Sequence, residues 1–180
     1  CPSCVNTDPQ EVLRRGLDVA TELQLPLLYG MRQDPDWSLA RQLEQLRAGD
    51  IVTYCFRRAP HCIVADGGIL PEIRDAQQRG ICFDVGHGCH SFDFEVAEIA
   101  FQSGFLPDTV STDLQRGHLG SHPTHTLPLV ASKMMSVGMP LADIFRAITR
   151  GPEAILQYQQ AAAFEAGQSA DCLVVAISNE

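Results

Sequence analysis

The histidines of this 180-residue chain are the residues best suited to chemistry, and they gather in two places. Five of the six follow either the predicted strand Ile81–Val85 or the predicted strand Asp108–Asp113. His87 lies between Gly86 and Gly88, and glycine lets a backbone approach a ligand closely. The alternative is a buried histidine whose nitrogens are satisfied within a tight turn. We take His87 as a candidate catalytic residue.

Asp113 closes the pattern Ser111-Thr112-Asp113, at the end of the second of these strands. A carboxylate in this place could bind a divalent metal ion or accept a proton from metal-bound water. A helix N-cap or a solvated loop aspartate is the alternative interpretation. Asp113 is our candidate metal ligand and a second candidate catalytic residue.

Three more histidines lie after Asp113, namely His118, His122 and His125. Their spacings of four and three could place two of them on one face of a helix. Glycine at 117 and 120 and proline at 123 disfavour a helix, so we predict a polar loop. We take His118 as a candidate contact to the substrate.

A pair of arginines follows the predicted strand Ile51–Phe56. Arg57 and Arg58, with His61, could hold a substrate carboxylate through fork-like hydrogen bonds. An ion pair on the protein surface is an equally simple explanation of the two arginines. All three residues are candidate substrate-binding residues.

Alternating helices and strands position these residues. The predicted strands and helices are the following: strands at Leu25–Tyr29, Ile51–Phe56, Ile81–Val85, Asp108–Asp113 and Cys172–Ile177, and helices at Val12–Leu23, Trp37–Leu46, Pro71–Arg79, Phe92–Gln102, Leu127–Val137 and Leu141–Arg150. The first four strands are spaced by the length of a βα unit. Four such units predict a parallel sheet, either open or closed as a barrel, with its ligands at the carboxyl ends of the strands.

The composition of the chain disfavours several classes of binding partner. The formal charge of −9 disfavours binding to nucleic acid or to an anionic membrane surface. The sequence has no apolar run near the ~20 residues that a membrane span requires. Seven cysteines without the spacing of a disulfide scaffold indicate a reducing, cytoplasmic environment. We therefore expect a cytoplasmic protein with a small-molecule substrate.

Several segments, in this order, resemble the dihydroorotase-like and deacetylase-like branch of the amidohydrolase superfamily. The most specific are the Gly-His-Gly and Ser-Thr-Asp blocks in combination. The segments that carry the resemblance are Ala48–Phe56, Phe83–Gly88, Gly104–Leu114, Ser132–Met135, Gly138–Leu141 and Ala166–Val175.

The resemblance implies the carboxyl-terminal half of a (β/α)8 barrel over residues 1–157. Residues 158–180 would then lead, with a terminal strand, into a small β-domain. It further implies a metal-dependent hydrolase of amide, cyclic amide or ester bonds. Asp113 matches the family's metal ligand and proton acceptor, and His87 matches a histidine near the metal and the substrate.

The chain also departs from the family pattern. The His-x-His pair and the carbamylated lysine of the family are absent, and Gly30 (or Tyr29) and Tyr54 stand where many members have histidine. The only lysine, Lys133, matches a helix position and is a poor candidate for a bridging ligand. One carboxylate cannot hold a catalytic metal, which normally has about three protein ligands. We expect a divalent metal, zinc by preference, with most of its ligands outside this chain.

Two interpretations follow. In the first, the chain is part of a metallohydrolase, inactive by itself and completed by a missing amino-terminal half. In the second, it is a non-catalytic half-barrel that acts as an oligomeric or small-molecule-binding module. An open half-barrel exposes sheet edges and an apolar inner face, so we expect self-association. We also expect the isolated chain to bind zinc weakly.

Overall fold

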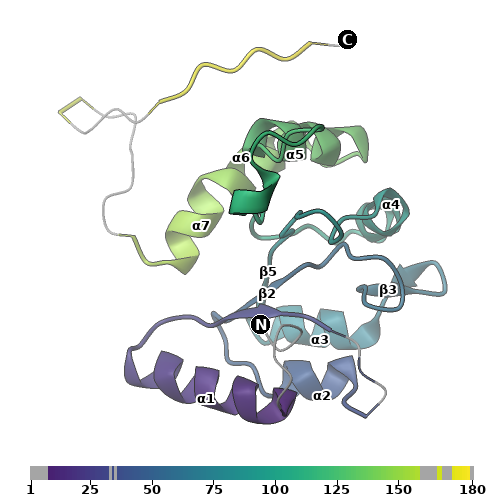
Figure 1. Ribbon diagram of the computed structural model, residues 1–180, viewed down its shortest axis with the longest axis vertical. Coiled ribbons are helices and arrows are strands. Elements are labelled where there is room, and N and C mark those ends of the chain that lie inside the picture. The colour runs from purple at the N-terminus through teal and green to yellow at the C-terminus, as the bar shows by residue number, and fades with distance from the viewer. Residues whose placement is uncertain (1–7, 33, 35, 159–165, 168–171, 179–180) are drawn as a thin grey trace.

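The structure is a computed structural model that describes residues 8–158 except 33 and 35, together with 166–167 and 172–178. A parallel sheet forms its centre (Figure 1). The sheet has the order β1 (Leu28–Gly30), β2 (Ile51–Thr53), β5 (Cys82–Phe83). A parallel bridge between Asp84 and Thr109 adds a fourth segment. The prediction of four βα units around a parallel sheet is confirmed.

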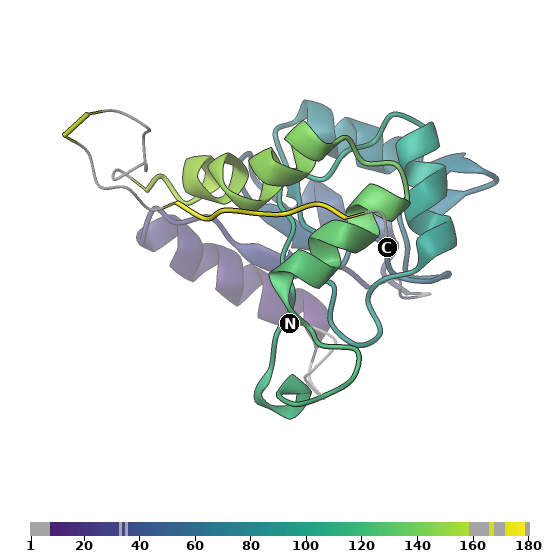
Figure 2. The ribbon, with the colours of Figure 1, turned by 90° about the horizontal axis from the view of Figure 1, so that it is seen from above.

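Helices form an outer arc around the strands, from α1 at the bottom of Figure 1 to α6 at the top. Figure 2 looks down on the helices that cover the strands from above. The helices are α1 (Pro9–Glu22), α2 (Leu39–Glu44), α3 (Pro71–Gln78), α4 (Phe94–Gln102), α5 (Leu127–Ser136), α6 (Leu141–Ile148) and α7 (Arg150–Ile155). The first six were predicted, whereas α7 and the hairpin of β3 (Val64–Ala65) and β4 (Gly68–Ile69) were not.

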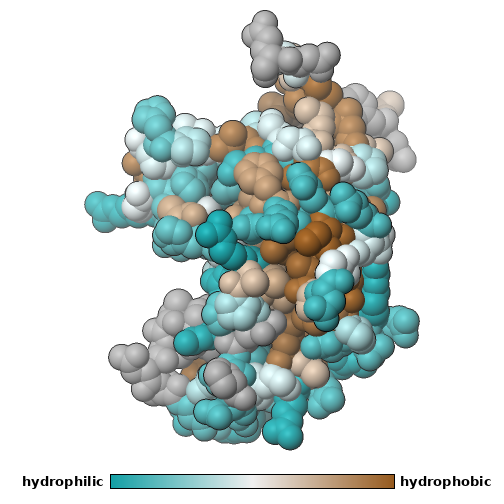
Figure 3. All heavy atoms as spheres, turned by 90° about the vertical axis from the view of Figure 1, so that its right-hand side faces the viewer, coloured by the Kyte–Doolittle hydropathy of each residue, from teal (hydrophilic) through white to brown (hydrophobic). Residues whose placement is uncertain are grey.

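The edge strand β1 has an exposed position, whereas all three residues of the central strand β2 are buried. Along β1, Tyr29 is buried, and its hydroxyl donates to Gln42 of α2, while its neighbour Leu28 is 62% exposed. Successive side chains of a strand point to opposite faces, so at β1 the helices cover only one of them. Figure 3 shows the molecule hollowed on one side, with apolar residues between two more polar lobes. This shape is that of a partial barrel.

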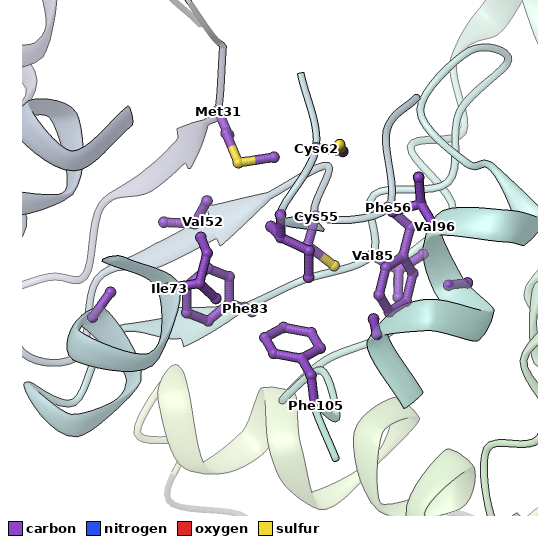
Figure 4. Packing of buried hydrophobic residues seen from close by; sticks show 14 of the residues in the cluster. Met31, Val52, Cys55, Phe56, Cys62, Ile73, Phe83, Val85, Val96 and Phe105 are labelled. Carbon is purple, nitrogen blue, oxygen red and sulfur yellow. The ribbon is translucent and has the colours of Figure 1, made fainter. Parts of the chain in front are cut away.

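Aromatic rings fill the space between sheet and helices (Figure 4). Phe56, Phe83 and Phe105 are fully buried, and the ring of Phe105 meets those of Phe83 and Phe56 edge-on at centroid distances of 5.4 and 6.1 Å. Edge-to-face contacts of this kind stabilise a core beyond the area that they bury. The core thus holds the strands rigidly beneath their carboxyl ends.

A polar cluster ties the strands together on the other face. The buried carboxylate of Asp84 accepts hydrogen bonds from the hydroxyls of Thr53, Thr109 and Ser111, at 2.6 to 2.7 Å. Gly86 follows with a φ of +52°, and a Cβ on it would lie 2.1 Å from the Thr53 hydroxyl oxygen. Only glycine therefore fits between these strands.

The amino-terminal ends of the strands are held by a second aspartate. Asp50 is buried and accepts hydrogen bonds from the backbone N–H groups of Leu27 and Arg47, both at 2.8 Å. The guanidinium of Arg47 also donates to Asp50, and it donates further to the Thr21 hydroxyl and to the carbonyl oxygen of Leu25. These bonds join α1, β1 and β2 at one point.

Two predicted strands differ from the structure. The segment Asp108–Asp113 makes only one bridge, at Thr109, although backbone hydrogen bonds continue beyond it. The predicted strand Cys172–Ile177 is wrong, since residues 172–178 form no strand and Val174 is 99% exposed. A strand needs a neighbouring strand to bond to, and the described residues supply none for this segment.

The domain boundary at residue 158 stays a prediction. No helix among the described residues is long and apolar enough to cross a membrane.

Candidate active site

The two motifs that carried the resemblance lie side by side at the carboxyl ends of the strands. The backbone N–H of His87 donates to the carbonyl oxygen of Ser111 at 3.1 Å, and that of Gly88 donates to Thr112 at 3.0 Å. A Cβ on Gly88 would lie 2.8 Å from Oδ2 of Asp113. Glycine at 88 therefore lets the Asp113 carboxylate lie directly against this backbone, one residue from His87.

His87 is buried and held from two sides. Its ring stacks on Phe92 at a centroid distance of 5.2 Å, and its Nε2 lies 2.8 Å from Nζ of Lys133. An ammonium group can only donate, so Nε2 accepts and the proton of the neutral ring is on Nδ1. Burial, together with the nearby charge of Lys133, lowers the pKa of His87 to about 4. The ring is therefore neutral at physiological pH.

Lys133, in α5, lies beside His87, a position that no sequence pattern indicates. Its Nζ also lies 5.6 Å from the ring centre of Phe92 and 5.7 Å from that of Phe94. Burial lowers the pKa of Lys133. In the structure its Nζ lies against Nε2 of His87.

Asp113 is half-buried and has a φ of +49°, which is unusual for a residue other than glycine. The side-chain amide of Gln115 donates to both carboxylate oxygens at 3.4 and 3.5 Å, which are long hydrogen bonds. Strained backbone and weakly bonded polar groups are typical of functional sites. Asp113 keeps most of its capacity to accept protons or to bind a cation.

The described residues do not complete the metal site that the family resemblance implies. Among them, no group of three potential ligand residues that includes Asp113 lies close enough together to hold an ion. Nε2 of His87 is hydrogen-bonded to Lys133, so that nitrogen is not free to bind an ion in this arrangement. Asp113 is thus suited to be one metal ligand, but the described residues do not supply the other ligands beside it.

A different group of ligand atoms does converge nearby. Sγ of Cys89 lies 3.1 Å from Nε2 of His118 and 3.8 Å from Nε2 of His125. The two imidazoles stack at a centroid distance of 4.3 Å, and the His125 ring meets that of His87 edge-on at 5.9 Å. The sequence-based prediction of a polar loop is correct for most of this segment, with one 3₁₀ turn at Arg116–His118. It missed Cys89, which lies 29 and 36 residues from these histidines.

The predicted substrate-binding residues occupy different environments. Arg57 donates to the Ser91 hydroxyl and to the carbonyl oxygen of Met31, and its guanidinium lies 4.2 Å from the Tyr54 ring centre. It thereby joins the loops that follow β1, β2 and β5.

Arg58 is 84% exposed and pairs with Asp93 at 3.0 Å. His61 is half-buried in the loop before β3, where its backbone N–H donates to Arg58. His118 faces Cys89, as described above. Arg57 and His118 therefore lie on loops at the carboxyl ends of the strands, and Arg58 lies at the rim.

No protein-family model matches the chain. Individual proteins do. A deacetylase from Agrobacterium fabrum is 34% identical over 163 residues, which cover 90% of this chain and 40% of the relative. A deacetylase from Brucella anthropi is 33% identical over 160 residues, 88% of this chain and 39% of the relative.

Solved structures give the same result. The crystal structure of an adenine deaminase matches 89% of this chain and 43% of its own, with a TM-score of 0.76 and 28% identity. That of a dihydroorotase matches 88% of this chain and 41% of its own, with a TM-score of 0.75 and 32% identity. The chain spans about two fifths of the length of the proteins that it matches. Over that part the chain is similar to deacetylases, to an adenine deaminase and to a dihydroorotase, which are proteins of the amidohydrolase superfamily, and it carries the paired Gly-His-Gly and Ser-Thr-Asp motifs on parallel βα units.

Proposed function

We propose that the protein is a hydrolase of amide, cyclic amide or ester bonds, to which this chain contributes Asp113 and His87. The observation that carries the proposal is the docking of the Gly-His-Gly turn on the Ser-Thr-Asp segment. Relatives named deacetylase, adenine deaminase and dihydroorotase support the reaction class. In each, water attacks a carbon that bears a leaving group, and a base must take the proton of that water.

Asp113 is the proposed proton acceptor. It lies at the carboxyl edge, and among the described residues its side chain is contacted by Gln115, through two long hydrogen bonds. An ionised carboxylate with unused lone pairs can take a proton from a water molecule that lies within hydrogen-bond reach. The close approach of Gly88 fixes the position of this carboxylate beside the His87 backbone.

His87 is the proposed hydrogen-bond donor to the substrate. Lys133 holds its Nε2, so the unpartnered Nδ1–H is the atom that can donate to a substrate oxygen. That atom is buried, and the ring of His125 lies edge-on against His87. Substrate access to Nδ1 therefore requires the segment that carries His125 to move aside. Arg57, Arg58, His61 and His118 are the proposed substrate contacts around it.

The proposed activity includes a divalent metal ion, zinc by preference, for which Asp113 supplies one ligand. A metal ion of this kind supplies Lewis-acid activation when bound. The other ligands lie beyond the described residues, so we assign them no positions.

The exposed edge strand β1 favours a partner for this chain. Leu25 and Leu28, beside and within the edge strand β1, are 55% and 62% exposed. Exposed apolar side chains next to an unpaired strand edge favour pairing with another strand. We propose that this edge is covered by a complementary barrel half or by a second copy of the chain. The non-catalytic binding module would use the same edge.

The test joins this chain in frame to the amino-terminal three fifths of the Agrobacterium fabrum deacetylase. We expect the joined protein to hydrolyse an N-acetylated amino acid with zinc present, and the separate chain to hydrolyse little. Asp113→Asn in the joined protein should abolish turnover, whereas the exposed Asp75→Asn on α3 should leave it unchanged. A folded joined protein without activity on amides, cyclic amides and esters would contradict the proposal.

A further inference from the structure

We propose that Cys89, His118 and His125 form a binding site for Zn²⁺ that is separate from the Asp113 position and locks the loop over His87. This inference does not rest on the proposed hydrolase activity. It rests on three ligand atoms that lie within 4.8 Å of one another. They come from two loops far apart in sequence, the turn after β5 and the segment between Asp113 and α5.

The distances suit an ion. With Zn–S near ~2.3 Å and Zn–N near ~2.0 Å, tetrahedral coordination places sulfur and nitrogen about 3.5 Å apart. The observed separations from Sγ of Cys89, 3.1 and 3.8 Å, lie on either side of this value. The third separation, between the two Nε2 atoms, is within 4.8 Å, against about 3.3 Å in a tetrahedral site. Rotation of the exposed Cys89 and of the two half-buried imidazoles would bring all three atoms to bonding distance.

Hydrogen bonding alone is a weaker explanation of the cluster. A thiol is a weak donor and its sulfur a weak acceptor, so the two imidazole Nε2 atoms directed toward the same sulfur gain little from hydrogen bonding. The His125 ring has no hydrogen bond at Nδ1 that would fix its orientation. What holds this ring is its stacking on His118 and the approach of its Nε2 to Cys89. A cation bound to both rings and to the thiolate would satisfy all three ligand atoms.

The surrounding backbone is already ordered for the site. Gly88, directly before Cys89, donates its N–H to Thr112 at 3.0 Å, and the Ser121 hydroxyl donates to the carbonyl oxygen of His118 at 2.8 Å. One bond must change on binding. Nδ1 of His118 accepts the N–H of Gln115 at 3.3 Å, and it must carry the proton when Nε2 binds an ion. Because Gln115 is exposed, water can replace that partner.

The donor set selects the kind of ion. One thiolate and two imidazoles favour Zn²⁺ over Mg²⁺ or Ca²⁺, which prefer oxygen ligands. Three protein ligands leave a fourth position for water. The ion would cross-link the two loops. It would hold segment 114–126, which projects in Figure 2, against the rest of the protein. Because His125 lies against His87, the bound ion would keep His87 covered.

The experiment titrates the whole chain, freed of metal by a chelator, with Co²⁺ as a spectroscopic probe and then with Zn²⁺ in competition. We expect one equivalent of Co²⁺ to give a thiolate-to-metal charge-transfer band that Zn²⁺ removes. Cys89→Ser should abolish the band, and His118→Gln or His125→Gln should weaken binding at least about tenfold. Cys4→Ser is the matched control, because Cys4 lies outside the proposed site, in the sequence Cys1-Pro2-Ser3-Cys4, whose two thiols could also bind a metal ion. It should change nothing.

Protection from trypsin gives an independent measurement. Arg116 lies in the exposed 3₁₀ turn beside His118, so Zn²⁺ should slow cleavage after Arg116 in the parent chain and not in Cys89→Ser. A band that survives Cys89→Ser and disappears in Cys4→Ser would overturn the proposal. So would a band that Asp113→Asn removes while Cys89→Ser leaves it, because the ion would then occupy the proposed hydrolase site.

Discussion

An aspartate lies at each end of the parallel sheet, and the hydrogen bonding of the two carboxylates is opposite in kind. At the amino-terminal end, Asp50 accepts short hydrogen bonds from two backbone N–H groups and from the guanidinium of Arg47. At the carboxyl end, Asp113 has a strained backbone and only long contacts from one amide. Close to it, Nδ1 of His87 and Nδ1 of His125 are buried without partners.

This difference separates stability from function. In barrel folds the amino-terminal face of the strands serves stability and the carboxyl face serves chemistry. A fully bonded carboxylate such as Asp50 contributes to the fold and has no capacity left for a ligand. A weakly bonded one such as Asp113 contributes little to the fold and keeps that capacity. Substitutions that distinguish the two ends therefore test the assignment of the site.

The largest effect is expected at Gly86, which lies at the carboxyl end, directly before His87. Gly86→Ala would bring a Cβ to 2.1 Å from the Thr53 hydroxyl and disrupt its bond to Asp84. The strain of a positive φ adds to this overlap, so we expect a loss of about 4 kcal/mol in the free energy of unfolding. Urea denaturation measures it.

Gly104→Ala is the control for this substitution. Gly104 also has a positive φ, of +73°, but a Cβ there would meet nothing within 4 Å. Only the backbone strain remains, and we expect a loss of about 1 kcal/mol. Equal losses in the two variants would show that the packing around Asp84 does not constrain position 86.

The second-largest effect is expected when the same substitution, aspartate to asparagine, is made at Asp50 and at Asp113. Asp50→Asn removes a charge that Arg47 and two backbone N–H groups need, and we expect it to lower the free energy of unfolding by about 3 kcal/mol. Asp113→Asn should change it by less than about 0.5 kcal/mol, because its contacts are long. Urea denaturation of both variants at neutral pH is the measurement. A larger loss in Asp113→Asn would reverse the assignment of the two ends.

The pH dependence of stability should show the same contrast with a smaller amplitude. Burial raises the pKa of Asp50, but hydrogen bonds from Arg47 and Leu27 outweigh it, so the folded-state pKa is lowered. The unfolded state then binds this proton at a higher pH than the folded state. The stabilisation is complete above the unfolded pKa of about 3.9 and is lost as pH falls through the folded pKa.

The measurement for this prediction is the difference in unfolding free energy between the parent chain and Asp50→Asn from pH 6 to about pH 3. We expect that difference to be constant down to about pH 4 and to shrink below it. A difference that grows on acidification would mean that the Asp50 pKa is raised in the folded state.

The sequence predicted the scaffold better than the site. Hydrophobic periodicity located six helices and the parallel strands, because α1 and α3 have one apolar face and β2 is a run of β-branched residues. It also located His87 and Asp113, since local motifs mark strand ends. It wrongly predicted a strand at Cys172–Ile177, where the β-branched residues form no strand in the structure.

Contacts between distant residues were out of reach. The pairing of Lys133 with His87 spans 46 residues, and that of Cys89 with His118 spans 29. Such pairs depend on how α5 and the loop before it pack across the sheet, which no local pattern records. The exposed position of Cys89, next to a glycine after a strand, is the single signal that could have drawn attention to it.

The smallest effect is expected at the rim of the carboxyl end, where the substrate role of Arg58 can be tested. Arg58 is 84% exposed, so its ion pair with Asp93 is screened, and Arg58→Ala should cost less than about 0.5 kcal/mol in unfolding free energy. Asp93→Ala should cost about 1 kcal/mol, because Asp93 also caps α4 by accepting the N–H groups of Glu95 and Val96. Urea denaturation distinguishes the two. Equal costs would make Arg58 a structural partner of the cap, whereas the expected difference leaves its guanidinium available at the rim to bind a substrate carboxylate.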